Sequence, residues 1–191
     1  MVFETNEPRT TMTLDKFQAA VTAALFERLP ISDDIRTFEF SLFGDFPGAF
    51  RAGCATLDTG IEQVEIVFNL PSYSDSVFLA VNESDPRVTA RLLANLEDYE
   101  RERGLQLKLG DSVVLSHENG SDGNLPFALI LLRTASSLDL LTVPDRLAIG
   151  GREARFFLAV PLSEPEWLVR REKGHDALID RFVKHDKSLA F

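Results

Sequence analysis

The residues of this chain best suited to bind a metal ion are two histidine–aspartate pairs near the C-terminus, His175-Asp176 and His185-Asp186. Imidazole and carboxylate groups are common metal ligands, so the repeated pair is a candidate site. If one helix carries both pairs, about 15 Å of helix axis separates them. All ligands of one ion must lie about 2 Å from it, so the pairs cannot share a metal. We interpret both histidines as solvated surface residues.

His117 beside Glu118 is a second candidate, for acid–base chemistry. A histidine next to a carboxylate can transfer protons, but the sequence shows no further partner for it. The following loop, "ENGSDGN", is rich in oxygen ligands yet lacks the residue spacing of a calcium loop. No dinucleotide-binding, phosphate-loop, nucleophile-elbow or zinc-protease motif occurs. We predict no enzyme activity, no metal and no cofactor, and a hydrolytic or metal-dependent enzyme is the least favoured function.

The single cysteine, Cys54, cannot form an internal disulfide, which is typical of a reducing compartment. It has no histidine nearby and no CxxC spacing, so we predict a buried structural residue rather than a nucleophile. The first residues lack the apolar core of a secretory signal. The longest apolar run, "FALILL", is far shorter than the roughly 20 residues of a membrane span. The sequence therefore predicts a cytoplasmic protein without membrane binding.

Acidic residues outnumber basic ones by 30 to 20, which gives a formal net charge of −10. This charge disfavours nucleic acid, because affinity for a phosphate backbone depends on cationic side chains. It attracts basic partners instead. The alternative, that acidity only keeps the chain in solution, stays open, as does the oligomeric state.

Two helices are predicted in the first half of the chain. Apolar residues recur every three or four positions over 13–29, with Thr13 as the expected N-cap. The same spacing occurs over 86–103, between an Asp85-Pro86 start and Gly104 as a C-cap. The acidic and basic residues at the end of this second helix are expected to be exposed.

Strands are predicted where apolar residues alternate or run together. They cover 37–44, 61–71 and the buried run 127–133, and two more flank a Gly-Gly turn within 146–160. The segment 44–60, with four glycines and a proline, is expected to be rich in turns. Helices and strands do not alternate regularly, so we predict an α+β fold with a mixed, largely antiparallel β-sheet and flanking helices.

The C-terminal part begins with a strand and continues with two helices. Ser163 and Glu166 match a capping box at the start of the first helix, and Gly174 separates it from the second. The domain boundaries predicted from the whole pattern are a flexible N-terminus (1–12), a single domain (13–187) and a short tail (188–191).

From about residue 60 to 187, the order of motifs resembles the Suppressor of fused domain family. The matching segments are, in order, "VEIVFNLP", "LANLEDYERERG", "LKLGDSVVL", "FALILLR" and "ARFFLAVPLSEPEWLVRREKGHDALIDRF". The last is the most specific, with an apolar strand, a P-L-[ST] turn, an acidic helix start and a glycine before the final helix. The chain resembles bacterial-type, single-domain members of this Suppressor of fused-like family.

The resemblance also assigns a binding site. In animal members the domain is a non-enzymatic regulator that holds a peptide of Gli-type transcription factors in a groove by strand addition. A tyrosine on the helix and an aspartate in the Gly-Asp turn line that groove, which implies partner-binding roles for Tyr99 and Asp111. The family's acidic pair after the next strand is replaced by Arg133-Thr134-Ala135, and the second domain of the animal proteins is expected to be absent. Both departures argue against the same transcription-factor partner.

The resemblance therefore predicts a non-enzymatic protein- or peptide-binding module that regulates or sequesters a protein partner. The alternative is an immunity protein that neutralises a basic toxin, a role attributed to some bacterial members. An acidic, compact protein suits that role because opposite charges favour association.

Overall fold

The computed structural model describes residues 14–31, 35–41, 48–115, 125–137, 140 and 142–191. These residues form one eight-stranded sheet with the strand order β1-β2-β3-β4-β8-β6-β5, and β7 pairs with β8 beside this path. The β4–β8 pair is parallel and all other strand pairs are antiparallel. The strands are β1 (Arg36–Phe40), β2 (Phe50–Asp58), β3 (Gln63–Leu70), β4 (Ser76–Asn82), β5 (Ser112–Val114), β6 (Ala128–Leu132), β7 (Arg146–Ile149) and β8 (Arg152–Leu162).

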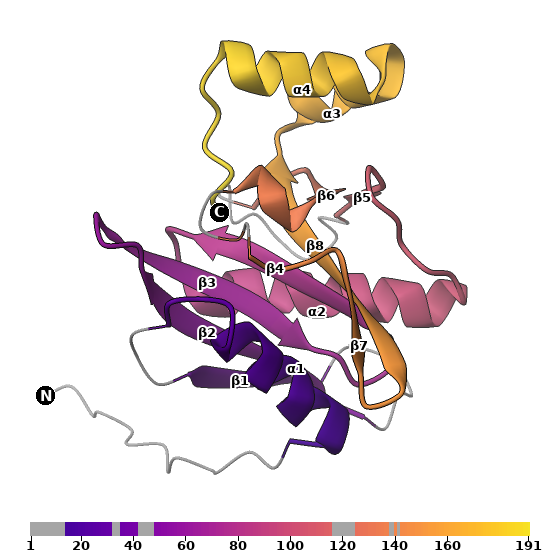
Figure 1. Cartoon of the computed structure of the whole chain (residues 1–191). Coiled ribbons are helices and arrows are strands. Elements are labelled where there is room, and N and C mark those ends of the chain that lie inside the picture. The colour runs from indigo at the N-terminus through magenta and orange to yellow at the C-terminus, as the bar shows by residue number, and fades with distance from the viewer. Residues whose placement is uncertain (1–13, 32–34, 42–47, 116–124, 138–139, 141) are drawn as a thin grey trace, which may run out of the picture.

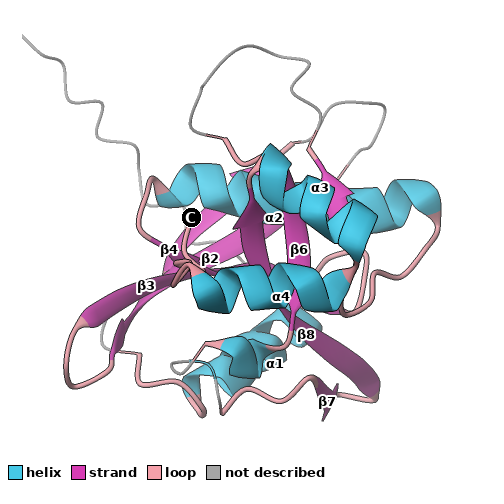
Figure 2. Ribbon diagram, turned by 90° about the horizontal axis from the view of Figure 1, so that it is seen from above, coloured by secondary structure: helices cyan, strands magenta, loops and turns pink. Residues whose placement is uncertain are grey.

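Helices cover both faces of this sheet (Figure 1). On one face, α2 packs over the central strands, and on the other lie α1 and α4. Helices α3 and α4 are neighbours (Figure 2), and Figure 1 shows both of them beyond the end of β8. The helices are α1 (Lys16–Phe26), α2 (Pro86–Arg103), the short 3-10 helix η1 (Thr134–Ser136), α3 (Glu164–Lys173) and α4 (His175–Lys184). The predicted α+β class with a mixed, largely antiparallel sheet is confirmed.

The alternation of side chains along β3 shows how one strand serves two cores. Ile66 and Phe68 are buried in the cluster beneath α1, whereas Val67 is buried in the cluster beneath α2. Successive residues of a strand point to opposite faces, so a strand covered on both sides carries apolar residues at consecutive positions. This confirms the prediction that the strand within 61–71 is central.

Helix α2 begins and ends as its sequence predicts. The Asp85 side chain accepts a hydrogen bond from the Arg87 backbone, Pro86 is the first helical residue, and Gly104 ends the helix with a φ of 58°. A left-handed backbone of this kind favours glycine because a Cβ atom would be strained there. The two helices predicted on either side of Gly174 are confirmed, and Gly174 between them has a positive φ of 93°, which favours glycine.

Two predictions for the N-terminal part are wrong. Helix α1 begins only at Lys16, and its N-cap is Asp15, which exchanges hydrogen bonds with Gln18, while Thr13 lies outside the described residues. The segment 44–60 contains the nine-residue strand β2 rather than turns alone. Gly53 in this strand allows the Phe68 ring to pack closely against the backbone, because a Cβ atom on Gly53 would lie 2.6 Å from that ring. No described helix has both the length and the apolar character needed to cross a membrane.

Candidate functional site

Asp111 lies in a tight turn at the start of β5. Its backbone N–H donates to the Lys108 carbonyl at 3.0 Å, and its side-chain Oδ2 accepts from the Lys108 N–H at 2.8 Å. Gly110 allows this turn with a φ of 83°. Backbone hydrogen bonds from Gly110 and to Asp111 then connect the turn to Leu131 in β6. The carboxylate therefore has a fixed position at the edge of the sheet and is partly exposed.

Tyr99 lies on the penultimate turn of α2 and is also partly exposed. One side of its ring packs against the core beneath α2, and the Arg103 guanidinium lies 5.7 Å from the ring centre. A tyrosine with one buried and one accessible side suits a binding surface, because its ring and its hydroxyl can both contact a partner. Tyr99 and Asp111 thus lie at the two ends of the connection between α2 and β5, and no hydrogen bond joins their side chains in the described part of the chain.

A buried polar cluster holds this connection against the sheet. Glu100, almost completely buried, accepts hydrogen bonds from the Leu107 backbone at 2.7 Å and the Ser76 hydroxyl at 2.9 Å. Arg155, from β8, lies 3.4 Å from the same carboxylate oxygen and donates to the Leu107 carbonyl at 3.0 Å. The backbone between Tyr99 and Asp111 is therefore anchored by Glu100 of α2 together with Arg155 of β8.

Glu97, one turn earlier in α2, is fully buried and holds the β3–β4 connection. It accepts backbone hydrogen bonds from Ser72 at 2.6 Å and Tyr73 at 2.7 Å. Burial raises the pKa of the Glu97 carboxyl, and these hydrogen bonds offset part of that effect. The expectation that the charged end of this helix is exposed is therefore wrong for Glu97 and Glu100. The spacing carries the missed signal, because they follow Leu93 and Leu96 by four residues and so share their buried face.

The outer edge of β5 is the most distinctive surface near Asp111. β5 is the last strand of the sheet and pairs only with β6 among the described strands. The Asp111 carbonyl accepts from the Leu131 N–H, and the Leu115 N–H donates to the Phe127 carbonyl. Because backbone groups alternate in direction along a strand, those of Ser112 and Val114 point outward. Leu109, just before the Asp111 turn, and Val114, on β5 itself, are exposed apolar residues. Backbone donors, backbone acceptors and apolar side chains therefore occur together at one edge.

Comparison with known proteins decides the family. A family model described as Suppressor of fused protein (SUFU) matches residues 53–191, which is most of the chain. The chain belongs to the Suppressor of fused family. The match extends the resemblance seen over residues 60–187 to include most of β2 and the C-terminal residues. No significant match was found among curated protein sequences.

Solved structures show the same fold for this Suppressor of fused-family protein. A suppressor of fused homologue from Neisseria gonorrhoeae FA 1090 has 14% sequence identity and a TM-score of 0.63, covering 92% of this chain and 93% of the other. A chain of the Sufu–Fu complex has 10% identity and a TM-score of 0.62, covering 88% of this chain and 84% of the other. At such low identities the likeness establishes the fold alone.

The histidines singled out in the sequence lie in different environments. His175 begins α4 and His185 follows its end, which confirms that the two pairs cannot share a metal. The prediction of a solvated surface residue holds only in part for His175, which is half-buried: its Nδ1 atom is buried beside Gly110 without a hydrogen-bond partner among the described residues. His117-Glu118 and the loop 118–124 lie outside the described residues. No group of three or more metal-ligating side chains occurs in the described part of the chain.

Cys54 is fully buried in β2, as predicted. Burial raises the pKa of its thiol to about 11, although the neighbouring Arg36 guanidinium, 3.2 Å from the sulfur, acts in the opposite direction. A thiol that is both buried and protonated is a poor nucleophile. Cys54 therefore contributes to packing beneath α2.

Proposed function

We propose that this Suppressor of fused-family protein is a non-enzymatic protein- or peptide-binding module that regulates or sequesters a protein partner. Tyr99 and Asp111 flank the binding site in this proposal. The observation that supports it most is the outer edge of β5, which no described strand pairs with and where the backbone groups of Ser112 and Val114 face away from the sheet. Such an edge binds an extended peptide by main-chain pairing, and adjacent side chains select the sequence.

The side chains around this edge fit that mode of binding. Leu109 and Val114 expose apolar surface that a bound segment would cover. Asp111 adds a fixed negative charge at the start of the strand. A chain of similar fold occurs in the Sufu–Fu complex, which supports a protein as the partner. One sheet runs from β1 to β5, so we assign residues 13–187 to a single binding domain.

The net charge of −10 favours a basic partner. It also supports the second candidate function, an immunity protein that neutralises a basic toxin in the cytoplasm. The two candidate functions differ in the activity of the partner when it is not bound to this protein. A toxic activity that is inhibited by this protein at equimolar amounts identifies an immunity protein, whereas a partner without such activity identifies a regulatory module.

The test is a proline at the exposed edge. Val114→Pro removes an outward N–H group and leaves the β5–β6 ladder intact, because proline is tolerated on edge strands. Tagged wild-type protein is used to capture a partner from its own host's lysate, and purified partner is then titrated against each variant. We expect Val114→Pro and Tyr99→Ala each to weaken binding at least about tenfold. Ile61→Ser is the matched control, since Ile61 is 95% exposed on the distant β2–β3 turn.

Salt dependence tests the proposed charge of the partner. Binding of a basic protein should weaken as salt rises, because exposed charges are screened. If the partner binds Val114→Pro as tightly as it binds the wild-type protein, the proposed role of the β5 edge is contradicted. Binding that is lost equally in Ile61→Ser would place the site elsewhere on the molecule.

A further inference from the structure

Residues 187–191, here termed the strap, run from the end of α4 back to the sheet. The Phe191 N–H donates to the Val81 carbonyl at 3.0 Å, and the Glu83 N–H donates to the Phe191 carbonyl at 3.0 Å. This pair of bonds on either side of Asn82 has the pattern of a parallel β-bridge. The strap therefore occupies the position of an added strand beside the end of β4.

This position is available because β4 and β8 diverge. Their parallel pairing extends only from Ser76 to Leu79 on β4, while β8 continues to Leu162 in partnership with β6. At Val81, β3 pairs with one edge of β4, which leaves the other edge of β4 for the strap. The gap between the two strands is a break in the sheet that an extended segment can fill.

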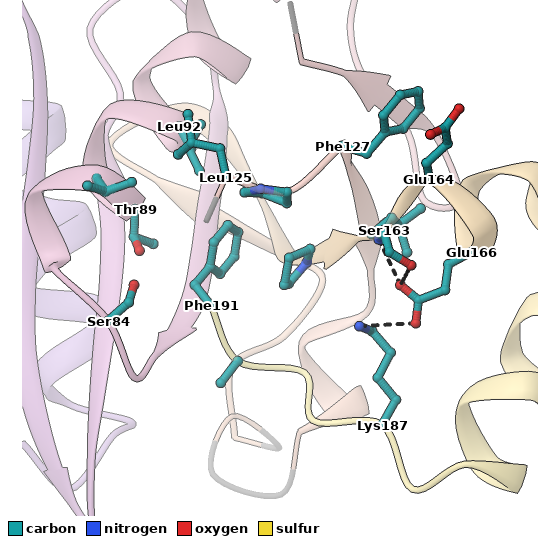
Figure 3. Close-up of a pocket in the computed structure, with 15 residues that line it drawn as sticks. Ser84, Thr89, Leu92, Leu125, Phe127, Ser163, Glu164, Glu166, Lys187 and Phe191 are labelled. Carbon is teal, nitrogen blue, oxygen red and sulfur yellow. Dashed lines mark hydrogen bonds and ion pairs between the residues drawn. The ribbon is translucent and has the colours of Figure 1, made fainter. Parts of the chain in front are cut away.

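A pocket of about 530 Å³ lies next to this break. Its walls combine apolar side chains from α2, from the end of β8 and from the segment before β6, among them Leu92, Leu125 and Leu162. Figure 3 shows the Phe191 side chain pointing from the strap toward Leu92 and Leu125. An aromatic ring in an apolar pocket beside a paired backbone is the arrangement by which proteins recognise extended peptides.

An ion pair holds the other end of the strap. Lys187 Nζ lies 3.2 Å from Glu166 Oε1, and Glu166 Oε2 accepts hydrogen bonds from the Ser163 N–H and hydroxyl at 2.8 Å. Burial acts to raise the pKa of Glu166, but these hydrogen bonds and the lysine charge outweigh it and lower the pKa. Glu164 also lines the pocket, so removal of Lys187 leaves two acidic side chains there.

We propose that this pocket is a second protein-binding site, whose ligand is an extended segment with a basic residue four positions before an aromatic residue. The strap, in which Lys187 and Phe191 have this spacing, is the intramolecular occupant that the ligand displaces. The two acidic side chains complement the basic residue, and the apolar walls complement the ring. Tyr99, Asp111, Ser112 and Val114 are not among the residues that line this pocket, so the inference does not rest on the proposed function.

The test uses the strap sequence as a separate molecule. A fluorescently labelled peptide with the sequence DKSLAF is titrated against the full chain, and binding is measured by fluorescence anisotropy. In the wild-type protein the tethered strap competes at a high effective concentration, so the peptide binds weakly. Phe191→Ala removes the anchor of the strap, and we expect it to bind the peptide at least about tenfold more tightly. Phe26→Ala, at an exposed phenylalanine of α1, is the matched control and should bind as the wild type does.

Three further measurements make the outcome decisive. A peptide with glutamate for lysine and alanine for phenylalanine should not bind Phe191→Ala. If Phe191→Ala does not fold, as judged by circular dichroism, Lys187→Gln replaces it, with tighter peptide binding expected again. Equal affinity of the opened variant and the wild type, or equal binding of both peptides, overturns the proposal. So does a dimer in gel filtration that exchanges its straps, because the pocket would then bind a second copy of this chain.

Discussion

Replacing Arg155 with methionine should lower the free energy of unfolding by about 3–5 kcal/mol, the usual cost of removing one partner from a buried ion pair. The side chains of Arg155 and Glu100 are only 12% and 2% exposed. Loss of the guanidinium leaves the Glu100 carboxylate without a cation in a site that water hardly reaches. One of its oxygens, Oε2, already has no hydrogen-bond partner among the described residues. Methionine is apolar and of similar length, so the cost arises mainly from charge and hydrogen bonding.

A second substitution separates the charge from the hydrogen bonds. Glu100→Gln keeps the side-chain oxygen that accepts from Leu107 but removes the negative charge. In the double variant neither charge remains buried, so its loss of stability should be smaller than the sum of the two single losses by at least about 2 kcal/mol. Arg146→Met is the matched control on the same hairpin, because its ion pair with Glu153 is 69% and 58% exposed and should contribute less than about 1 kcal/mol.

Urea unfolding at pH 7, followed by circular dichroism, measures all four variants on the same scale. The slope of the free energy against urea must stay constant for the comparison to hold. A loss below about 1 kcal/mol for Arg155→Met would refute the reasoning, since it would mean that the Glu100 charge is solvated or compensated elsewhere. Strictly additive single variants would likewise show that the two side chains are not coupled.

Three other predictions follow from buried groups. Cys54, with a pKa of about 11, should react with a thiol reagent at pH 8 at least about a hundredfold more slowly in native protein than in urea, and equal rates would contradict its burial. Gly53→Ala should destabilise the fold by about 1–3 kcal/mol in urea unfolding, because its Cβ would clash with Phe68, and an unchanged midpoint would show that the ring can move. Because the pKa of Glu97 is raised in the folded state, this residue contributes most to the free energy of unfolding at low pH. The contribution is lost as the pH rises through the pKa of the folded state. The stability of the wild-type protein relative to Glu97→Gln should therefore fall as the pH rises above 4.5, the ordinary pKa of a glutamate, and a constant difference would refute the shift.

The parts of the fold that the sequence determined are those with local signals. Asp85 and Gly104 specify the ends of α2 through a side-chain cap and a left-handed backbone, and neither depends on distant residues. The run over 127–132 is apolar at every position, and neighbouring residues of a strand face opposite sides of the sheet. The run therefore predicts a strand that is buried on both faces. The order of such segments was also sufficient to indicate the family, and with it the candidate residues Tyr99 and Asp111.

Tertiary structure decided what depends on neighbours far away in the chain. β2 forms from a glycine-rich segment because β1 and β3 supply its hydrogen bonds and the Phe68 ring fills the space that Gly53 leaves. Glu100 is buried because Arg155, 55 residues later, supplies its positive charge and a hydrogen bond to the connection beyond α2. Local patterns carry no information about such partners, since the pairing energy exists only after the elements have packed. The same packing brings the strap to the end of β4, where two backbone hydrogen bonds connect segments more than a hundred residues apart.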